Sequence, residues 1–275
     1  MKQPSRAASA LVARMSRRGI RRSVVDEFGN QLVLLLPDRL CMQIYADREY
    51  EQDVVAFAKR VLRPGMVAFD VGAHIGMHTV LFRKLVATAG RVVAFEPIGL
   101  LFEILSANAA GDSRVQLESL AVADGGTTEL VLKYYGLSFS GWTTAFEPHA
   151  DASLLRKMPT PRLIRVPSTS LDAYAEETGV DPDFIKLDIE GGELTALRGA
   201  RRLIARAKPF IIMECGDSGR LESHSTSRCL ELLERSGYQF LEFDKRLGLV
   251  QRHAVRASYP EHSNLLGVPK EPPGG

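Results

Sequence analysis

The stretch MVAFDVGAHIGMHTVLF, residues 66–82, decides the fold of this chain. It reads as a buried strand that ends at Asp70, followed by a turn containing glycines and by the start of a helix. The same order of strand and helix recurs along the sequence. The further pairs are RVVAFEP with LLFEILSANAAG (91–111), FIKLDIE with GELTALRGARRLIARA (184–207), and PFIIMECG with SRCLELLERSG (209–237). Strands that alternate with helices predict βαβ units and a mostly parallel, doubly wound sheet.

The alternation is interrupted between residues 125 and 170. VQLESLAVAD (115–124) is the expected third strand, and no helix pattern follows it. The segment instead holds strand-like runs and the aromatic stretch LSFSGWTTAF (137–146). An insertion of this kind predicts a hairpin and a lid over a site. At the end of the chain, YQFLEFD (238–244) and NLLGVPK (264–270) lie close together in sequence, so one of these strands should be antiparallel.

The N-terminal region differs from the rest of the chain. Residues 1–22 carry seven basic side chains and no acid, so they can contact an anionic membrane surface, although a solvated tail is the simpler interpretation. SVVDEFGNQLVLLLPD (23–38) predicts a hairpin around Gly29 and Asn30, and residues 50–62 predict a helix. We therefore divide the chain into a basic segment plus hairpin (1–49) and an α/β domain (50–275).

The composition excludes several classes of protein. The chain has 275 residues, of which 45% are hydrophobic and 25% charged, as in ordinary globular domains. Its net charge of +2 gives no global argument for nucleic acid. The three cysteines show no metal-binding spacing, and no apolar run is long enough to span a membrane. These features favour a cytoplasmic protein.

The turn after the first buried strand indicates a cofactor. In DVGAHIG (70–76), Gly72 and Gly76 allow a tight turn and a close backbone approach, but the loop lacks the GxGxxG pattern. An acid such as Asp70 beside the loop would repel a pyrophosphate and would suit a positively charged cofactor. S-adenosylmethionine, which carries an ammonium and a sulfonium, fits this requirement. Glu96 ends the next strand, 20 residues after Gly76, where an acid typically binds ribose hydroxyls.

With these motifs placed, the chain resembles the FkbM-type family of S-adenosylmethionine-dependent methyltransferases. The matching text is MVAFDVGAHIGMHTVLF, VVAFEP, LAVAD, SLDAYAEE, DFIKLDIEGGELTALRGA and PFIIMECG. The resemblance covers roughly residues 50–269, so 50–275 would be the methyltransferase domain. It implies a class I, Rossmann-like fold with a seven-stranded sheet. It also implies methyl transfer to a hydroxyl of a glycan, glycolipid or polyketide-type metabolite.

The resemblance also implies a set of cofactor-binding residues. Asp70, Gly72, Ala73, His74 and Gly76 would line the methionine end, Glu96 and Pro97 the ribose, and Ala121, Val122 and Asp124 the adenine. His74 departs from the asparagine usual in the family, which leaves its polar role open.

Carboxylates at the ends of two further strands suggest the catalytic groups. An alcohol is a weak nucleophile while neutral, so a positioned base accelerates its methylation. We expect Asp188 at the methyl group and the acceptor, with Glu190 either as the base or as an acid at a helix start. His78 and Glu214 are further candidates for the base. Asp188 and Glu214 could also hold a divalent cation, although nothing in the spacing requires a metal.

The acceptor should be a small molecule or a glycan or lipid-linked compound. Trp142, Ser138 and Phe139 in the insertion are the expected acceptor-binding residues, because indole faces stack on sugars. Three alternatives remain at this point: an NAD-dependent oxidoreductase, a cofactor-binding module without catalysis, and a nucleic-acid or other N- or O-methyltransferase. The absent GxGxxG pattern argues against the first, and no RNA-binding motif supports the last.

Overall fold

A central sheet organises the described part of the computed structural model, which comprises residues 19–48, 50–146, 152–216, 226–244, 249–259 and 263–270. In these residues the sheet has eight strands in the order β12-β11-β13-β10-β9-β3-β4-β5. Their bounds are β3 Val67–Val71, β4 Arg91–Phe95, β5 Val115–Glu118, β9 Phe184–Leu187, β10 Phe210–Cys215, β11 Tyr238–Asp244, β12 Leu249–His253 and β13 Ser263–Pro269. The expected number of seven is therefore wrong, because β12 adds a strand at the edge.

The strand directions follow the sequence pattern. β5, β4, β3, β9 and β10 are mutually parallel, as the strand–helix alternation predicts. β13 runs antiparallel between β10 and β11, and β12 pairs antiparallel with β11. The prediction of an antiparallel strand near the C-terminus is thus confirmed.

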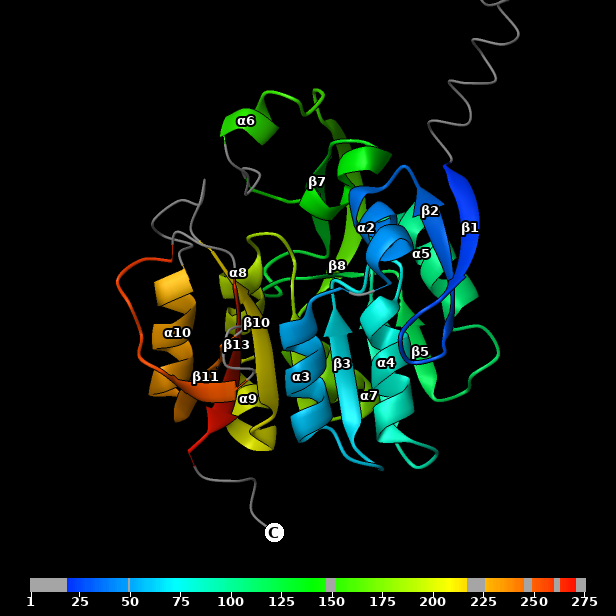
Figure 1. Cartoon of the computed structure of the whole chain (residues 1–275). Helices are drawn as coiled ribbons and strands as arrows, with labels where there is room; N and C mark the ends of the chain where they lie inside the picture. Colours follow the sequence, from blue (N-terminus) through cyan, green and yellow to red (C-terminus); the bar gives the residue numbers. More distant parts are fainter. Residues whose placement is uncertain are drawn as a thin grey trace, which may run out of the picture.

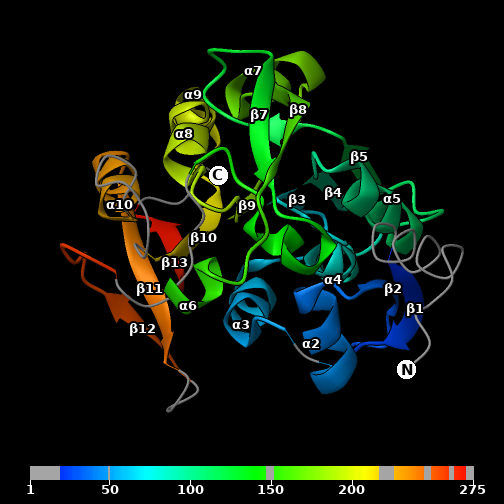
Figure 2. The same cartoon turned by 90° about the horizontal axis from the view of Figure 1, so that it is seen from above.

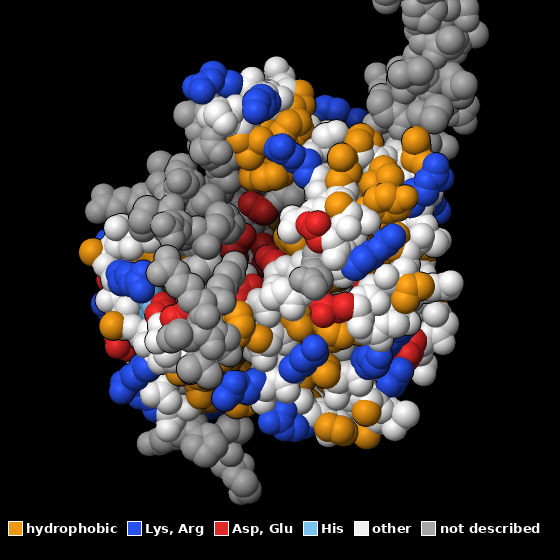
Figure 3. Space-filling view, in the orientation of Figure 1, with side chains coloured by type: hydrophobic (Ala, Val, Ile, Leu, Met, Phe, Trp, Pro, Cys, Tyr) orange, Lys and Arg blue, Asp and Glu red, His pale blue; other side chains and the backbone are white. Residues whose placement is uncertain are grey.

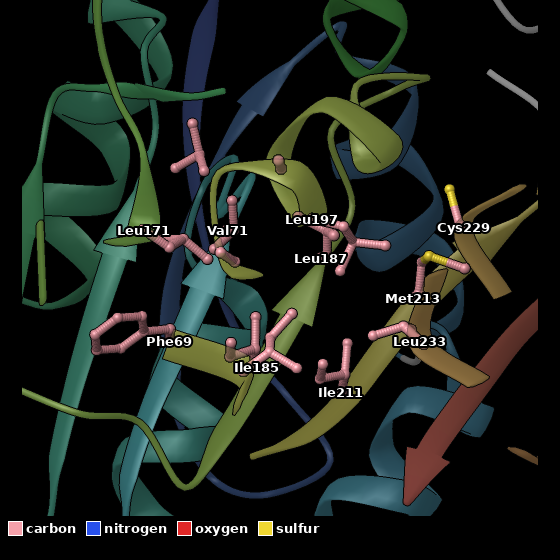
Figure 4. Packing of buried hydrophobic residues seen from close by; sticks show 14 of the residues in the cluster. Phe69, Val71, Leu171, Ile185, Leu187, Leu197, Ile211, Met213, Cys229 and Leu233 are labelled. Carbon is pink, nitrogen blue, oxygen red and sulfur yellow. The ribbon is translucent and has the colours of Figure 1, made fainter. Parts of the chain in front are cut away.

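Helices cover both faces of the sheet (Figures 1 and 2). One face packs on α3 (Gln52–Val61), α4 (Met77–Val86) and α5 (Gly99–Asn108), and the other on α7 (Leu171–Thr178), α8 (Glu193–Arg198), α9 (Arg201–Ala207) and α10 (Thr226–Arg235). Figure 4 shows the second face, where Phe69, Ile185 and Ile211 from adjacent strands meet Leu171 and Leu197 from the helices. These five side chains are at most 2% exposed, so the strand ends are held by a close-packed core.

The predicted helix over 192–207 is two helices, α8 and α9. The break falls at Gly199, where an added Cβ would lie 2.1 Å from the carbonyl oxygen of Ala123. The chain therefore needs glycine at this close approach, and the Gly199 carbonyl accepts a hydrogen bond from the Asp172 N–H at 2.8 Å. The third predicted strand is also divided, because residues 115–118 join the main sheet and β6 (Ala121–Val122) leaves it.

The insertion forms a hairpin and a cover, as predicted. β7 (Glu129–Tyr134) pairs antiparallel with β8 (Arg162–Thr169), which also pairs with β6. The 3₁₀ helix η1 (Leu137–Trp142) and α6 (Ala152–Leu155) complete the insertion. Figure 1 shows it above the carboxyl ends of the parallel strands. A cover in this position places its side chains at the crevice where open α/β sheets bind ligands.

The N-terminal hairpin is confirmed, with β1 (Ile20–Val25) paired to β2 (Gln31–Leu36). A helix that the sequence pattern did not predict follows it, α2 (Arg39–Asp47), whose first turn is capped by the Asp38 carboxylate through the Cys41 N–H. β2 and α2 share an apolar cluster with α4, α5 and the insertion. Residues 1–18, most of the basic segment, lie outside the described residues. None of the helices described here is both long and apolar enough to cross a bilayer.

Candidate active site

A cavity of about 510 Å³ lies beyond the carboxyl ends of β3, β4, β9 and β10. The insertion and α2 form its outer walls. In Figure 3, acidic side chains are visible at the bottom of a hollow on this face of the molecule. The cavity brings together most of the residues that the sequence analysis selected. These are Gly72, Ala73, His74, His78, Glu96, Pro97, Ala121, Val122, Trp142, Asp188, Glu190 and Glu214.

The glycine loop after β3 forms the bottom of the cavity. Gly72 has φ +84°, and an added Cβ would lie 1.8 Å from the carbonyl oxygen of Asp188. Only glycine therefore lets the end of β9 approach this loop so closely. The N–H groups of Gly72 and Ala73 both donate to the carbonyl of Phe95, which fixes the loop on the neighbouring strand.

Glu96 is positioned by the same loop. Its side chain is 4% exposed, and its two oxygens accept the backbone N–H of His74 at 2.9 Å and of Ile98 at 2.8 Å. Burial raises the pKa of the Glu96 carboxyl to about 8, although both hydrogen bonds favour the charged form. A carboxylate held by two backbone donors at a cavity wall has lone pairs left for the hydroxyls of a ligand.

Three residues assigned to the cofactor do not line the cavity. Asp70 is fully buried behind the loop, where it accepts a 2.6 Å hydrogen bond from the Thr79 hydroxyl. Gly76 is the N-cap of α4 and faces Leu105, which an added Cβ would approach to 2.5 Å. Asp124 is exposed and caps a turn through the Gly126 N–H. Asp70 and Asp124 thus support their loops from behind or outside, and Gly76 gives the backbone room beside Leu105. Their assignment to the cofactor stays a prediction.

Three carboxylates cluster at the ends of β9 and β10. Oxygens of Asp188, Glu190 and Glu214 all lie within 4.8 Å of one another. Glu190 adopts φ +54°, a left-handed conformation that turns the chain at the end of β9. The acid at the start of α8 is Glu193, which accepts the N–H groups of Ile189 and Gly191. Glu190 therefore precedes the helix and belongs to the cluster.

The carboxylate cluster has two chemical uses. Adjacent carboxylates repel one another, which favours proton uptake by one of them and hence a role as a base. Three carboxylate oxygens at this spacing are also a suitable donor set for a hard divalent cation such as Mg²⁺.

Lys186 is a residue of the candidate site that the sequence reasoning missed. It lies inside β9, is 2% exposed, and its ammonium is 2.8 Å from the Asp188 carboxylate. Burial by itself would lower the pKa of Lys186, but Asp188, Glu51 and Asp70 outweigh it and raise the pKa. Lys186 is therefore a fixed cation, not a base. A lysine between two apolar residues in FIKL was the signal available in the sequence.

His78 is poorly suited to act as a base. Its side chain is 6% exposed and stacks on Phe82, with Nε2 3.6 Å from a Glu51 oxygen. Burial lowers the pKa of His78 well below its usual value, and the Lys186 charge lowers it further. Burial also raises the pKa of Glu51. Glu51 and Tyr50, which line the cavity just before α3, carried no recognisable motif.

The acceptor-side residues predicted in the insertion lie at different distances from the cavity. Trp142 lines the cavity, but Ser138 and Phe139 do not. Phe139 instead packs beside Trp142, with ring centroids 6.0 Å apart. The serine that reaches the cavity is Ser140, which donates to Asp38 and lies 2.9 Å from His74 Nε2. The 3₁₀ turns of η1 decide which side chains point inward, and the sequence did not predict this helix.

Comparisons with known proteins identify similar chains among methyltransferases and related solved structures. A curated relative, hexuronic acid methyltransferase AglP from Haloferax volcanii, is 29% identical over 170 residues, which cover 61% of this chain and 63% of the relative. This chain thus matches less than two thirds of that relative's length. The crystal structure of methyltransferase FkbM from Methylobacillus flagellatus KT is 18% identical with a TM-score of 0.42, covering 77% of this chain and 49% of that one. Fibrillarin from Aeropyrum pernix, solved with natively bound S-adenosyl-L-methionine, is 12% identical with a TM-score of 0.41, covering 90% and 93%.

The family model gives the decisive match. The model for the methyltransferase FkbM domain matches residues 70–240, more than half of the chain. The matched segment runs from the glycine loop through the carboxylate cluster into β11. The sheet order, with antiparallel β13 between β10 and β11, is that of the class I, Rossmann-like methyltransferase fold. The chain therefore belongs to the FkbM methyltransferase family.

Proposed function

We propose that this methyltransferase uses S-adenosylmethionine to methylate a hydroxyl group of a glycan or glycan-bearing acceptor. The observation that carries the proposal is the carboxylate cluster of Asp188, Glu190 and Glu214, which shares one cavity with the glycine loop and Glu96. A relative named for hexuronic acid supports a sugar acceptor over a polyketide. Six acidic side chains line the cavity wall, and those that are ionised disfavour a nucleic acid, whose phosphates they would repel. The six are Asp38, Glu51, Glu96, Asp188, Glu190 and Glu214.

The residues present fit S-adenosylmethionine. The cradle at Gly72, which a side chain would fill, admits the methionine end, and Glu96 offers its carboxylate to the ribose hydroxyls. The apolar side chains of Ala121 and Val122 suit the adenine. When bound, the cofactor supplies an electrophilic methyl group on a sulfonium. The acidic wall stabilises the cofactor's positive charges, whereas the pyrophosphate of NAD would be repelled by it.

Asp188 is the residue best placed to accept the proton of the acceptor hydroxyl. The Lys186 ammonium fixes one of its oxygens at 2.8 Å, which orients the carboxylate at the cavity wall. Glu190 and Glu214 lie close enough to share the proton afterwards. Since methyl transfer is an in-line displacement, holding the hydroxyl at the end of β9 contributes as much as the base itself.

Cofactor binding should depend on pH through Glu96. Because burial raises the pKa of Glu96 to about 8, its carboxyl holds a proton in the free protein below that pH. Ribose hydroxyls donate to the ionised form, so affinity should rise between pH 6 and pH 9, with proton release on binding below pH 8. Glu96→Gln should remove this dependence and weaken binding about 10- to 100-fold, as one charge-assisted hydrogen bond is worth about 1.5–3 kcal/mol.

Calorimetry with S-adenosylmethionine and its demethylated product, in buffers of different ionisation enthalpy, measures both the affinity and the protons released. A pH-independent affinity that Glu96→Gln leaves unchanged would refute the assignment of Glu96. Tight binding of NAD without any response to S-adenosylmethionine would refute the proposed cofactor.

A further inference from the structure

The outer wall of the cavity carries an arginine held over two aromatic rings. Arg39 is the first residue of α2, and its guanidinium carbon lies 5.6 Å from the ring centroid of Phe139 and 5.7 Å from that of Trp142. Both rings belong to η1 in the insertion. Arg39 lines the cavity, and its side chain is exposed. Cation–π contact with two rings restricts the guanidinium to this wall.

Arg39 differs in its partners from the other basic side chain of the cavity. Lys186 is paired with Asp188 at 2.8 Å, at the bottom of the cavity. Among the described residues, Arg39 forms no ion pair and no side-chain hydrogen bond. Its contacts are with ring faces, which leave the N–H groups at the guanidinium edge available for a ligand.

The charges of the cavity are therefore unevenly distributed. The carboxylates of Asp188, Glu190 and Glu214 cluster at the strand ends, and the guanidinium stands on the wall formed by α2 and η1. A ligand with one negative group is repelled from the cluster and attracted to Arg39. Such a ligand binds in one orientation, with its uncharged groups toward Asp188.

We propose that the acceptor is an acidic sugar, a uronate, whose carboxylate binds Arg39 while a ring hydroxyl faces Asp188. This inference rests on the proposed function and names its substrate class. A planar guanidinium matches a carboxylate with two parallel N–H···O bonds, so Arg39 would fix both position and orientation. Phe139 and Trp142 then act mainly on Arg39, which they hold in place. Phe139 thus contributes without lining the cavity.

A sugar phosphate would offer the same guanidinium a different anion. A phosphate monoester carries up to two negative charges, and the single unpaired cation among the described lining residues stands in the same cavity as the cluster of Asp188, Glu190 and Glu214. This balance favours the singly charged carboxylate.

The test uses four matched acceptors: a uronate-terminated oligosaccharide, its carboxyl-reduced form, its methyl ester, and the corresponding sugar phosphate. We expect the unmodified enzyme to prefer the uronate over both neutral forms by about 10- to 100-fold in kcat/KM. Arg39→Gln should remove this preference, mainly by raising the KM for the uronate, and cost the neutral acceptors much less. Arg39→Lys should restore part of the preference, since it keeps the charge and loses the fork.

Arg48→Gln is the matched control. Arg48 is the C-cap of the same helix, lies over the Tyr45 ring at 5.3 Å, and does not line the cavity. The Arg48→Gln substitution should leave the preference for the uronate intact. Melting curves for all variants show whether the fold is retained.

Two outcomes would overturn the inference: equal kcat/KM values for the uronate and its reduced form, or equal losses of kcat/KM for both acceptors in Arg39→Gln. A preference for the sugar phosphate would overturn the assignment of a carboxylate to Arg39. A second test needs no turnover. Calorimetry measures the binding of the uronate to the enzyme loaded with demethylated cofactor. In this binding experiment, weaker uronate binding by Arg39→Gln than by the unmodified enzyme supports the role of Arg39, even if no acceptor is methylated. The absence of methylation would refute only the proposed function. Equal uronate binding by both proteins refutes the role of Arg39.

Discussion

Asp188→Asn is expected to lower the turnover rate by about 100-fold or more, the contribution typical of a positioned base. The substitution keeps the volume of the side chain and an oxygen that can still accept from Lys186, whose ammonium is 2.8 Å from the carboxylate. It removes the charge that would take the hydroxyl proton. Affinity for the cofactor should change little, because Glu96 and the glycine loop are untouched. Single-turnover kinetics and calorimetry on the same preparation separate the two effects.

Stability must be followed in the same variant. Asp188 is one of three acids, with Glu51 and Asp70, whose charges keep the buried Lys186 protonated. Asp188→Asn should lower the melting temperature, because the buried Lys186 ammonium loses one of the negative charges that compensate it. Glu190→Gln and Glu214→Gln are matched controls, as each removes one charge of the cluster and should cost less turnover. If Glu190→Gln is inactive and Asp188→Asn active, the two roles are reversed.

Gly72→Ala is expected to damage both the cofactor site and the fold. The new Cβ would lie 1.8 Å from the carbonyl oxygen of Asp188, at a residue with φ +84°. The backbone strain alone costs about 1–3 kcal/mol. Relief of the clash must also separate the loop from the end of β9, so cofactor affinity should fall about tenfold or more, which corresponds to 1.4 kcal/mol. Thermal unfolding and calorimetry measure the two losses.

Gly99→Ala serves as the control for this change. Gly99 is the first residue of α5, and an added Cβ there has no atom within 4 Å. An alanine at a helical position without clash should be neutral or slightly stabilising. Native cofactor affinity and melting temperature in Gly72→Ala would contradict the close approach of the loop and β9.

The elements that periodicity and glycine motifs define could be predicted from the sequence. The parallel strands, the flanking helices and the hairpin of the insertion each follow from local patterns. Gly72, Glu96 and Asp188 follow from their places at strand ends, which meet at one edge of a parallel sheet. The division of the helix at Gly199 could not be predicted, because it depends on the Ala123 backbone, distant in sequence.

The missed parts of the site share a physical reason. Lys186 and Glu51 act through charges that meet only in three dimensions, and Arg39 through rings that η1 brings over it. The direction of Asp70 does not follow from its place in the sequence, because a strand-end acid can point behind a loop as well as toward a ligand. Here the hydrogen bond from Thr79 holds it behind the loop. The position of a residue in the sequence predicts that it lies at the carboxyl edge of the sheet. The direction in which its side chain points can be seen only in the structure.

The reaction proposed for this cavity is methyl transfer from S-adenosylmethionine to a sugar hydroxyl at Asp188. The most direct measurement incubates the enzyme with methyl-labelled cofactor and uronate-bearing oligosaccharides, and locates the label by mass spectrometry of the product. We expect one labelled methyl ether per acceptor, formed with an equal amount of demethylated cofactor, and a rate at least about 100-fold lower for Asp188→Asn. Label on nitrogen or carbon, or unchanged ether formation in Asp188→Asn, would contradict the proposed reaction.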